Sequence, residues 1–80
     1  MASRRLHLTF PEKLITQPVI FELGKRFDVI TNIRRANIEE KVGWVILEIE
    51  GSSDQIDAAA AHLGLLGVQV SPIEGDVTQG

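Results

Sequence analysis

The chain has 80 residues, of which 44% are hydrophobic and 24% charged, with a formal net charge of −3 and no cysteine. This composition is typical of a globular domain and not of a disordered segment, and a chain of this length has room for one small core. The absence of cysteine excludes disulfides, thiolate zinc sites, iron–sulfur clusters and cysteine nucleophiles. We therefore expect a single domain over residues 1–80.

Two features of the chain bear on its compartment. No apolar run approaches the about 20 residues that a membrane span requires. Arg4 and Arg5 are followed by alternating residues and not by the continuous apolar stretch of a signal peptide. We therefore expect a soluble, cytoplasmic protein without membrane insertion.

The first two elements are a strand and a helix. Residues 5–10 alternate between polar and apolar side chains, the period of a half-buried strand, and Pro11 ends it. After a short loop, Pro18 occupies a first helical position, and apolar residues follow at spacings of three and four. This spacing predicts a helix over about residues 18–27.

A hairpin is expected next. Residues 29–39 are rich in β-branched side chains, but the alternation changes parity, which predicts a bulge near Arg34 and Arg35. A turn at residues 41–43 then leads to a third strand. In that strand Val45, Leu47 and Ile49 face one way, while Trp44, Ile46, Glu48 and Glu50 face the other.

A second helix and a last strand complete the chain. Ser52 and Gln55 have the spacing of a capping box, and Gly67 offers a left-handed stop, which together predict a helix over about residues 53–66. A short strand follows, which Pro72 marks as an edge. The ordered core is expected over about residues 4–73, and residues 74–80 are polar enough to form a frayed tail.

This element order predicts an α+β fold, the ferredoxin-like βαββαβ sandwich. Right-handed crossovers place both helices on one face of a four-stranded antiparallel sheet, in the spatial order 4-1-3-2. The expected core consists of Leu6, Leu8, Phe10, Leu23, Phe27, Val45, Leu47, Ile49, Ile56, Leu63 and Val68. The other side of the sheet, the open face, is expected to carry His7, Thr9, Trp44, Ile46, Glu48, Gln69 and Ser71.

Signals of catalysis are missing from the sequence. There is no glycine-rich phosphate loop, no nucleophile elbow, no His-Glu-x-x-His helix and no calcium loop. His7 lies in a strand and His62 near a helix C-terminus, where a structural or solvated histidine is the favoured interpretation. We therefore expect no enzyme activity, no catalytic or metal-binding residues and no cofactor.

Two surface features remain open to interpretation. Trp44 beside Ile46 on the open face, with His7 nearby, indicates either a partner surface or a tryptophan packed on its own neighbours. The basic pairs 25–26 and 34–35 could meet phosphates or a carboxylate, but a solvated edge is favoured. Nucleic acid is not expected, because the first strand lacks stacking aromatics on this face and the net charge is negative.

Several runs of residues are similar to one known family, and the resemblance extends over about residues 5–73. They are residues 8–11, 18–20, 27–38, 43–48 and 67–70. These runs resemble the NIL domain, a ferredoxin-like relative of the ACT domain. Asn32 and Ile33 match the tripeptide that names the family, whereas Arg34 stands in place of leucine.

The resemblance implies a regulatory role. The NIL domain is best known as the C-terminal regulatory domain of the ATPase subunit of methionine ABC transporters, where it pairs and binds methionine to inhibit transport. Other members are fused to iron–sulfur ferredoxin domains or stand alone. If the Arg34 side chain points into the ligand site, the resemblance favours a ligand that is more acidic or larger than methionine. If it points to solvent, a ligand with a side chain like that of methionine can still bind.

We place the expected ligand site between the loop before the first helix, the start of that helix and the second strand. Backbone N–H groups at a helix start attract a carboxylate. Asn32 offers a donor and an acceptor, for the ligand or for the backbone at the bulge. The expected ligand-binding residues are Thr16, Gln17, Pro18, Val19, Asn32, Ile33 and Arg34.

Two functions follow from these observations. The first is a small-molecule-binding regulatory or sensor domain for an amino acid or similar metabolite, acting as a homodimer through an edge strand, with the second strand favoured. The alternative is a protein–protein interaction module without a small ligand, whose open face docks a separate transporter or redox protein. In that case His7, Trp44 and Ile46 form the partner surface.

Overall fold

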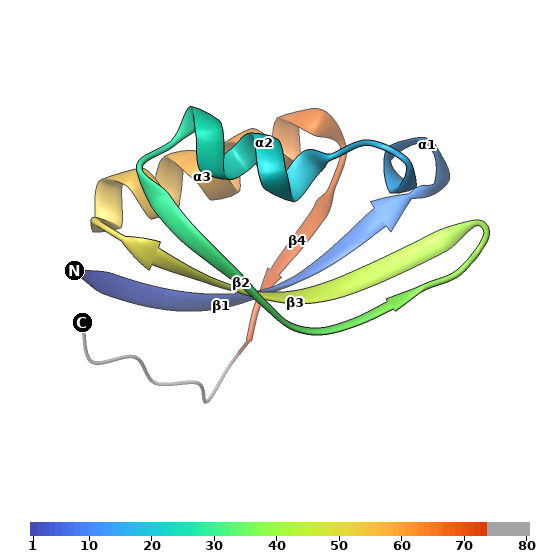
Figure 1. Ribbon diagram of the computed structural model, residues 1–80, viewed down its shortest axis with the longest axis horizontal. Helices are drawn as coiled ribbons and strands as arrows, with labels where there is room; N and C mark the ends of the chain where they lie inside the picture. The colour runs from blue at the N-terminus through green and yellow to red at the C-terminus, as the bar shows by residue number, and fades with distance from the viewer. Residues whose placement is uncertain (74–80) are drawn as a thin grey trace.

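A computed structural model describes residues 1–73 of the chain, so the predicted tail at residues 74–80 lies outside the described residues (Figure 1). Three helices and four strands make up the described part. In chain order they are β1 (Ala2–Pro11), α1 (Glu12–Ile15), α2 (Val19–Arg26), β2 (Val29–Ile38), β3 (Val42–Gly51), α3 (Ser53–Leu66) and β4 (Gln69–Pro72).

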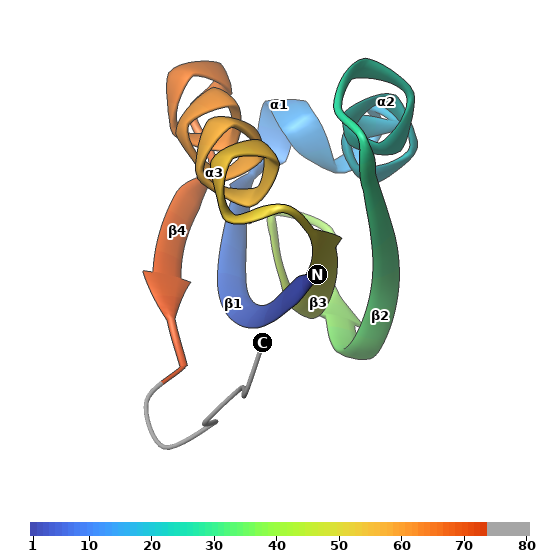
Figure 2. The ribbon, with the colours of Figure 1, turned by 90° about the vertical axis from the view of Figure 1, so that its left-hand side faces the viewer.

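The strands form one antiparallel sheet in the order β2-β3-β1-β4, which is the predicted order. All helices lie on one face of the sheet, with α2 on the side of β2 and α3 on the side of β4 (Figure 2). The predicted ferredoxin-like α+β sandwich is confirmed. Within residues 1–73, no helix is both long enough and apolar enough to cross a bilayer.

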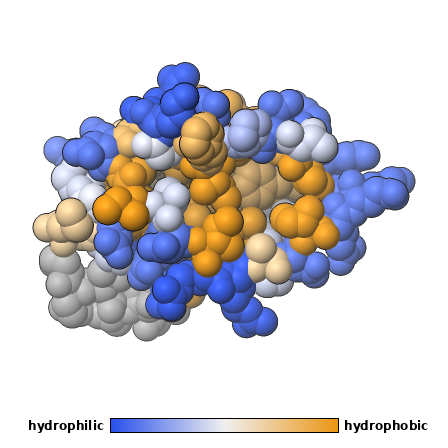
Figure 3. Space-filling view, viewed as in Figure 1, coloured by the Kyte–Doolittle hydropathy of each residue, from blue (hydrophilic) through white to orange (hydrophobic). Residues whose placement is uncertain are grey.

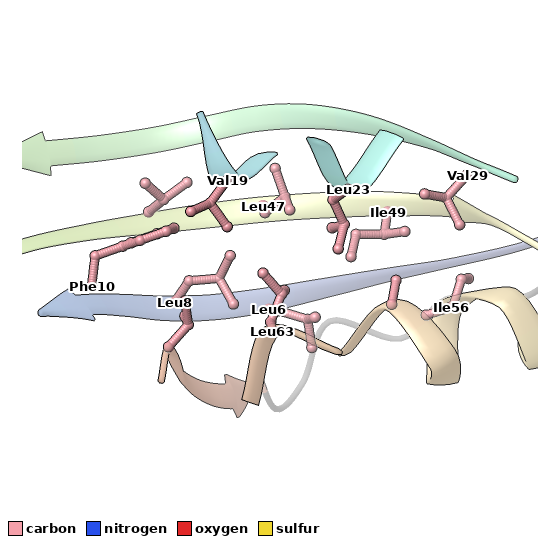
Figure 4. Close-up of a cluster of buried hydrophobic side chains, with 13 residues drawn as sticks. Leu6, Leu8, Phe10, Val19, Leu23, Val29, Leu47, Ile49, Ile56 and Leu63 are labelled. Atoms are coloured by element: carbon pink, nitrogen blue, oxygen red, sulfur yellow. The ribbon is translucent and has the colours of Figure 1, made fainter. Parts of the chain in front are cut away.

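The core lies between the sheet and the helices (Figure 4). Ten of the eleven predicted core residues are buried, and Phe27 is half-buried against the cluster. Val19, Val29 and Ala59 are buried as well, although they are not among the predicted core residues. They sit at the ends of elements or are small, and apolar periodicity is a weak signal for such positions.

The first half of the chain differs from the prediction in the extent of β1, in an additional helix and in the position of the hairpin turn. β1 extends over ten residues and continues to Pro11, and a four-residue helix α1 follows where a loop was expected. A helix of one turn is too short to show a periodic pattern, although Leu14 and Ile15 pack against the core. The hairpin turn also falls earlier than expected, because Val42 and Gly43 already pair with β1.

The predicted bulge in β2 is present. The pairing with β3 passes from Ile33 opposite Leu47 to Arg35 opposite Ile46, which leaves Arg34 as the extra residue. Because side chains alternate along a strand, one extra residue exchanges the faces of all residues beyond it. Ile33 and Ala36 therefore lie on the same face of β2, toward the helices.

Both ends of α3 are capped as predicted. The Ser52 Oγ accepts a hydrogen bond from the Gln55 backbone N–H at 3.2 Å. Gly67 adopts a left-handed φ of 104°, and its N–H donates to the Gly64 carbonyl. These caps fix the longest helix of the described residues over the core.

Replacing Ser52 with alanine should lower the free energy of unfolding by about 1 kcal/mol, because the Gln55 N–H loses its side-chain acceptor. Urea unfolding followed by circular dichroism measures the loss. Ser53→Ala is the matched control, since Ser53 is already helical and does not cap the helix. Equal effects of the two substitutions would show that the cap does not stabilise α3.

Candidate ligand groove and open face

An apolar groove opens between α2, the α1–α2 connection and the edge strand β2. Its volume is about 250 Å³. We call it the edge groove. Its lining consists of Phe10, Leu14, Ile15, Gln17, Pro18, Val19, Ile20, Phe21, Ile33, Ala36, Ile38 and Val45. Among the described residues, no charged side chain lines it.

The outer rim of the edge groove is exposed apolar surface. The exposed fractions are 64% for Phe21 on α2, 58% for Ile33 and 54% for Ile38 on β2. Orange side chains gather between α2 and β2 on the face seen in Figure 3. Contiguous exposed apolar surface of this kind is typical of a binding site, because soluble monomers rarely expose large continuous apolar patches, whereas single exposed apolar residues are common.

Within the described residues, the lining of the edge groove has one polar side chain, that of Gln17 before α2. Gln17 lines the groove, and its carbonyl accepts from the Val19 N–H at 2.8 Å across Pro18, in an inverse γ-turn with φ −80° and ψ 59°. No side chain caps α2. The N–H groups of Ile20 and Phe21, in the first turn, have no intrahelical acceptor, and such donors suit a carboxylate.

The sheet divides the residues that the sequence predicted for the ligand site. Gln17, Pro18, Val19 and Ile33 line the edge groove. Thr16 is the exposed C-cap of α1 and lies outside the lining. Asn32 and Arg34 lie on the open face instead. Asn32 pairs with Glu48 in the sheet, and the Arg34 side chain reaches the same residue.

The reason for this division is the alternation of side chains along β2. Asn32 and Ile33 are neighbours in sequence, so their side chains point to opposite faces of the sheet. Arg34 is the bulge residue, and its Nη1 lies 3.7 Å from Glu48 Oε1 on the open face. Arg34 is thus directed away from the edge groove.

The open face brings together the three residues predicted as a partner surface. His7 on β1 and Trp44 on β3 stack with ring centroids 5.4 Å apart and an interplanar angle of 18°. Ile46 pairs directly with His7. All three side chains are half-buried, so the stacked rings are partly covered by each other, as expected of a tryptophan packed on its own neighbours.

A polar cluster occupies the other half of the open face. The Glu48 carboxylate, with a side chain only 18% exposed, lies 3.8 Å from Arg5 Nε and 3.7 Å from Arg34 Nη1. It also accepts a hydrogen bond from Ser3 Oγ at 3.3 Å. We call these four residues the Glu48 cluster, and it links the bulge of β2 to β3 and β1.

The second histidine has a packing role. His62 on α3 meets the Phe27 ring edge to face, with centroids 5.5 Å apart. Among residues 1–73, no three side chains of histidine, aspartate or glutamate lie close enough together to hold a metal ion.

The fold and the edge groove define a ferredoxin-like α+β domain with a concave apolar site beside an edge strand. The family model of the NIL domain matches residues 4–72. The chain belongs to the NIL domain family.

Similar proteins carry this domain as part of a longer chain. Methionine import ATP-binding protein MetN of Lactococcus lactis subsp. cremoris (strain MG1363) and that of Lactococcus lactis subsp. lactis (strain IL1403) are each 34% identical over 61 residues, covering 71% of this chain. The match spans only 17% of the length of each relative.

A solved structure has the same fold. The C-terminal domain of an ABC transporter ATP-binding protein from Enterococcus faecalis superposes with a TM-score of 0.80, covering 91% of this chain and 86% of that one, at 22% identity.

Proposed function

We propose that this chain is a non-catalytic regulatory domain that binds an amino acid or a similar metabolite in the edge groove. The observation that carries the proposal is the apolar groove beside a helix start without a side-chain cap. The apolar lining suits an uncharged side chain, while the N–H groups of Ile20 and Phe21 suit the ligand carboxylate. Gln17 offers an amide to the remaining polar group.

The size of the groove supports a ligand of amino-acid scale. Its volume of about 250 Å³ lies just below the about 300 to 1,000 Å³ of pockets for drug-sized molecules. Arg34 lies on the open face and cannot neutralise an acidic ligand in the groove. A ligand with an uncharged side chain like that of methionine is therefore favoured. The curated relatives are named for methionine import, and we propose a cytoplasmic setting by analogy with their ATP-binding role.

Calorimetric titration with the twenty amino acids tests the proposal, starting with L-methionine. We expect saturable binding of L-methionine or another apolar amino acid, and no binding of aspartate or glutamate. An acidic amino acid as the best ligand would contradict the proposed chemistry of the groove. Heat from none of the twenty would contradict an amino-acid ligand.

The domain is further proposed to pair through β2. β2 is an edge strand of ten residues, and its outer edge has N–H and C=O groups that can continue the sheet in a second copy. The exposed rim residues Ile33 and Ile38 belong to the same strand. Such pairing would cover part of this rim and would place the ligand near the dimer seam.

Replacing Ile33 with lysine should shift the protein to a monomer at high micromolar concentration. Antiparallel pairing centred on the middle of β2 places Ile33 beside its own copy, and two lysines there would repel each other. Multi-angle light scattering gives the mass. Leu65→Lys is the control, because Leu65 is 86% exposed on α3 and should leave the dimer intact. A wild-type protein that is monomeric in this range would exclude the pairing.

A second candidate function uses the open face. His7, Trp44 and Ile46 lie together there, and they could anchor a partner protein such as a transporter or redox component without a small ligand. The substitution Trp44→Ala separates the two candidates. Under this alternative it abolishes partner binding, whereas under the first candidate it leaves amino-acid binding unchanged.

A further inference from the structure

The bulge of β2 determines which side chains form the wall of the edge groove. Ile33 precedes the bulge, whereas Ala36 and Ile38 follow it, and all three line the groove. In a regular strand, alternation from Ile33 would turn Arg35 and Asn37 toward the groove instead. The continuous apolar wall therefore exists only while β2 keeps one extra residue between Ile33 and Ala36, and in this structure that residue is Arg34.

The Glu48 cluster holds this extra residue from the opposite side of the sheet. Arg34 Nη1 lies 3.7 Å from Glu48 Oε1, and the other oxygen of the carboxylate lies 3.3 Å from Ser3 Oγ and 3.8 Å from Arg5 Nε. Apart from Arg34, Glu48 is held by two groups of β1, Ser3 Oγ and Arg5 Nε, and its side chain is mostly buried. A fixed carboxylate is a firm attachment point for the more mobile guanidinium, whose side chain is 50% exposed.

We infer that Arg34 is a positioning residue for the edge groove, which it shapes through the Glu48 cluster on the opposite face of the sheet. This inference rests on the proposed function in taking the groove to be the ligand site. The physical path is short, because the Arg34 backbone lies between two groove-lining stretches of the same strand. By linkage, a ligand that tightens the groove wall must also tighten the contact between Arg34 and Glu48.

The adjacent arginine provides a matched control. Arg35 carries the same charge, lies on the open face opposite Ile46, and has no ion pair among residues 1–73. Arg34→Gln and Arg35→Gln thus remove equal charge from neighbouring positions, and only the first removes a contact with Glu48. Arg34→Lys keeps the charge and should largely preserve the contact with Glu48.

Two measurements on the full chain test the inference. In methyl NMR spectra, Arg34→Gln should shift the signals of Ile33 and Ile38 on the far face, while Arg35→Gln should leave them in place. The affinity for the fluorescent probe 8-anilinonaphthalene-1-sulfonate, an aromatic anion that binds apolar grooves, should fall about two- to fivefold in Arg34→Gln, the range that a partly exposed ion pair allows, and should be retained in Arg34→Lys. The midpoint of urea unfolding should fall only slightly in Arg34→Gln, because a partly exposed ion pair contributes little to stability, and should stay unchanged in Arg35→Gln and Arg34→Lys.

Unchanged isoleucine methyl signals in Arg34→Gln, or equal changes in Arg35→Gln, would overturn the inference. So would an equal loss of probe affinity in the two glutamine variants. These readouts need no natural ligand. If no amino acid binds the wild-type protein, the proposed ligand is wrong, whereas the role of Arg34 is still decided by the methyl signals and the probe affinity.

Discussion

Replacing Leu63 with alanine is expected to lower the free energy of unfolding by about 2 to 5 kcal/mol. The side chain lies on α3 and is 0% exposed within the core cluster, so its removal leaves a cavity that the packed sheet cannot close. A domain of this length has a total stability of only about 4 to 12 kcal/mol, so the loss is a large share. Urea unfolding monitored by circular dichroism measures it.

Leu65→Ala is the matched control, two residues along the same helix. Leu65 is 86% exposed, so the same chemical change should alter the free energy of unfolding by no more than about 0.5 kcal/mol. A large loss in this control would show that Leu65 is covered in solution, for instance by a second copy. A small loss in Leu63→Ala would contradict the packing of α3 on the sheet.

The parts of the fold that sequence reasoning predicted well are those with local signals. The bounds of α3 follow from Ser52 and Gln55 at one end and Gly67 at the other, because each cap depends on residues within one turn. The alternation of polar and apolar residues along β1 and β3 predicted which side chains face the core, because this signal also depends only on neighbouring residues. The parity change in β2 predicted its bulge.

The parts that it missed have no periodic signal. α1 is a single turn between Pro11 and Thr16, and its residues read equally well as loop. α2 is one residue shorter at each end than predicted, because Pro18 is its N-cap and Phe27 its C-cap. The exact ends of short helices depend on tertiary contacts, which the helix propensities of single residues do not reflect.

The candidate site was predicted only in part, and the reason is geometric. Asn32, Ile33 and Arg34 are grouped in the prediction through the tripeptide that names the family, yet neighbouring residues of a regular strand point to opposite faces, so Asn32 and Ile33 cannot line one site. The remaining wall of the edge groove could have been found from the sequence. Ala36 and Ile38 continue the apolar face of Ile33 once the bulge is applied.

The two faces of the sheet therefore carry different chemistry. The helix side of β2 ends in the apolar edge groove, while the open face carries the stacked rings and the Glu48 cluster. A ligand in the groove and a partner on the open face would not compete for the same atoms. Both would contact β2 or its direct neighbours, so the bulge is the element through which one could influence the other.

Replacing Ala36 with phenylalanine is expected to reduce the affinity for L-methionine at least about tenfold, because the new ring fills the edge groove from the wall of β2. The fold should survive, since Ala36 is exposed on an edge strand and aromatic residues suit strands. Calorimetric titration of the variant measures the loss. Asn37→Phe is the matched control, because Asn37 pairs with Trp44 on the open face and its ring would point away from the groove. Full affinity in Ala36→Phe, or an equal loss in Asn37→Phe, would place the ligand outside the groove.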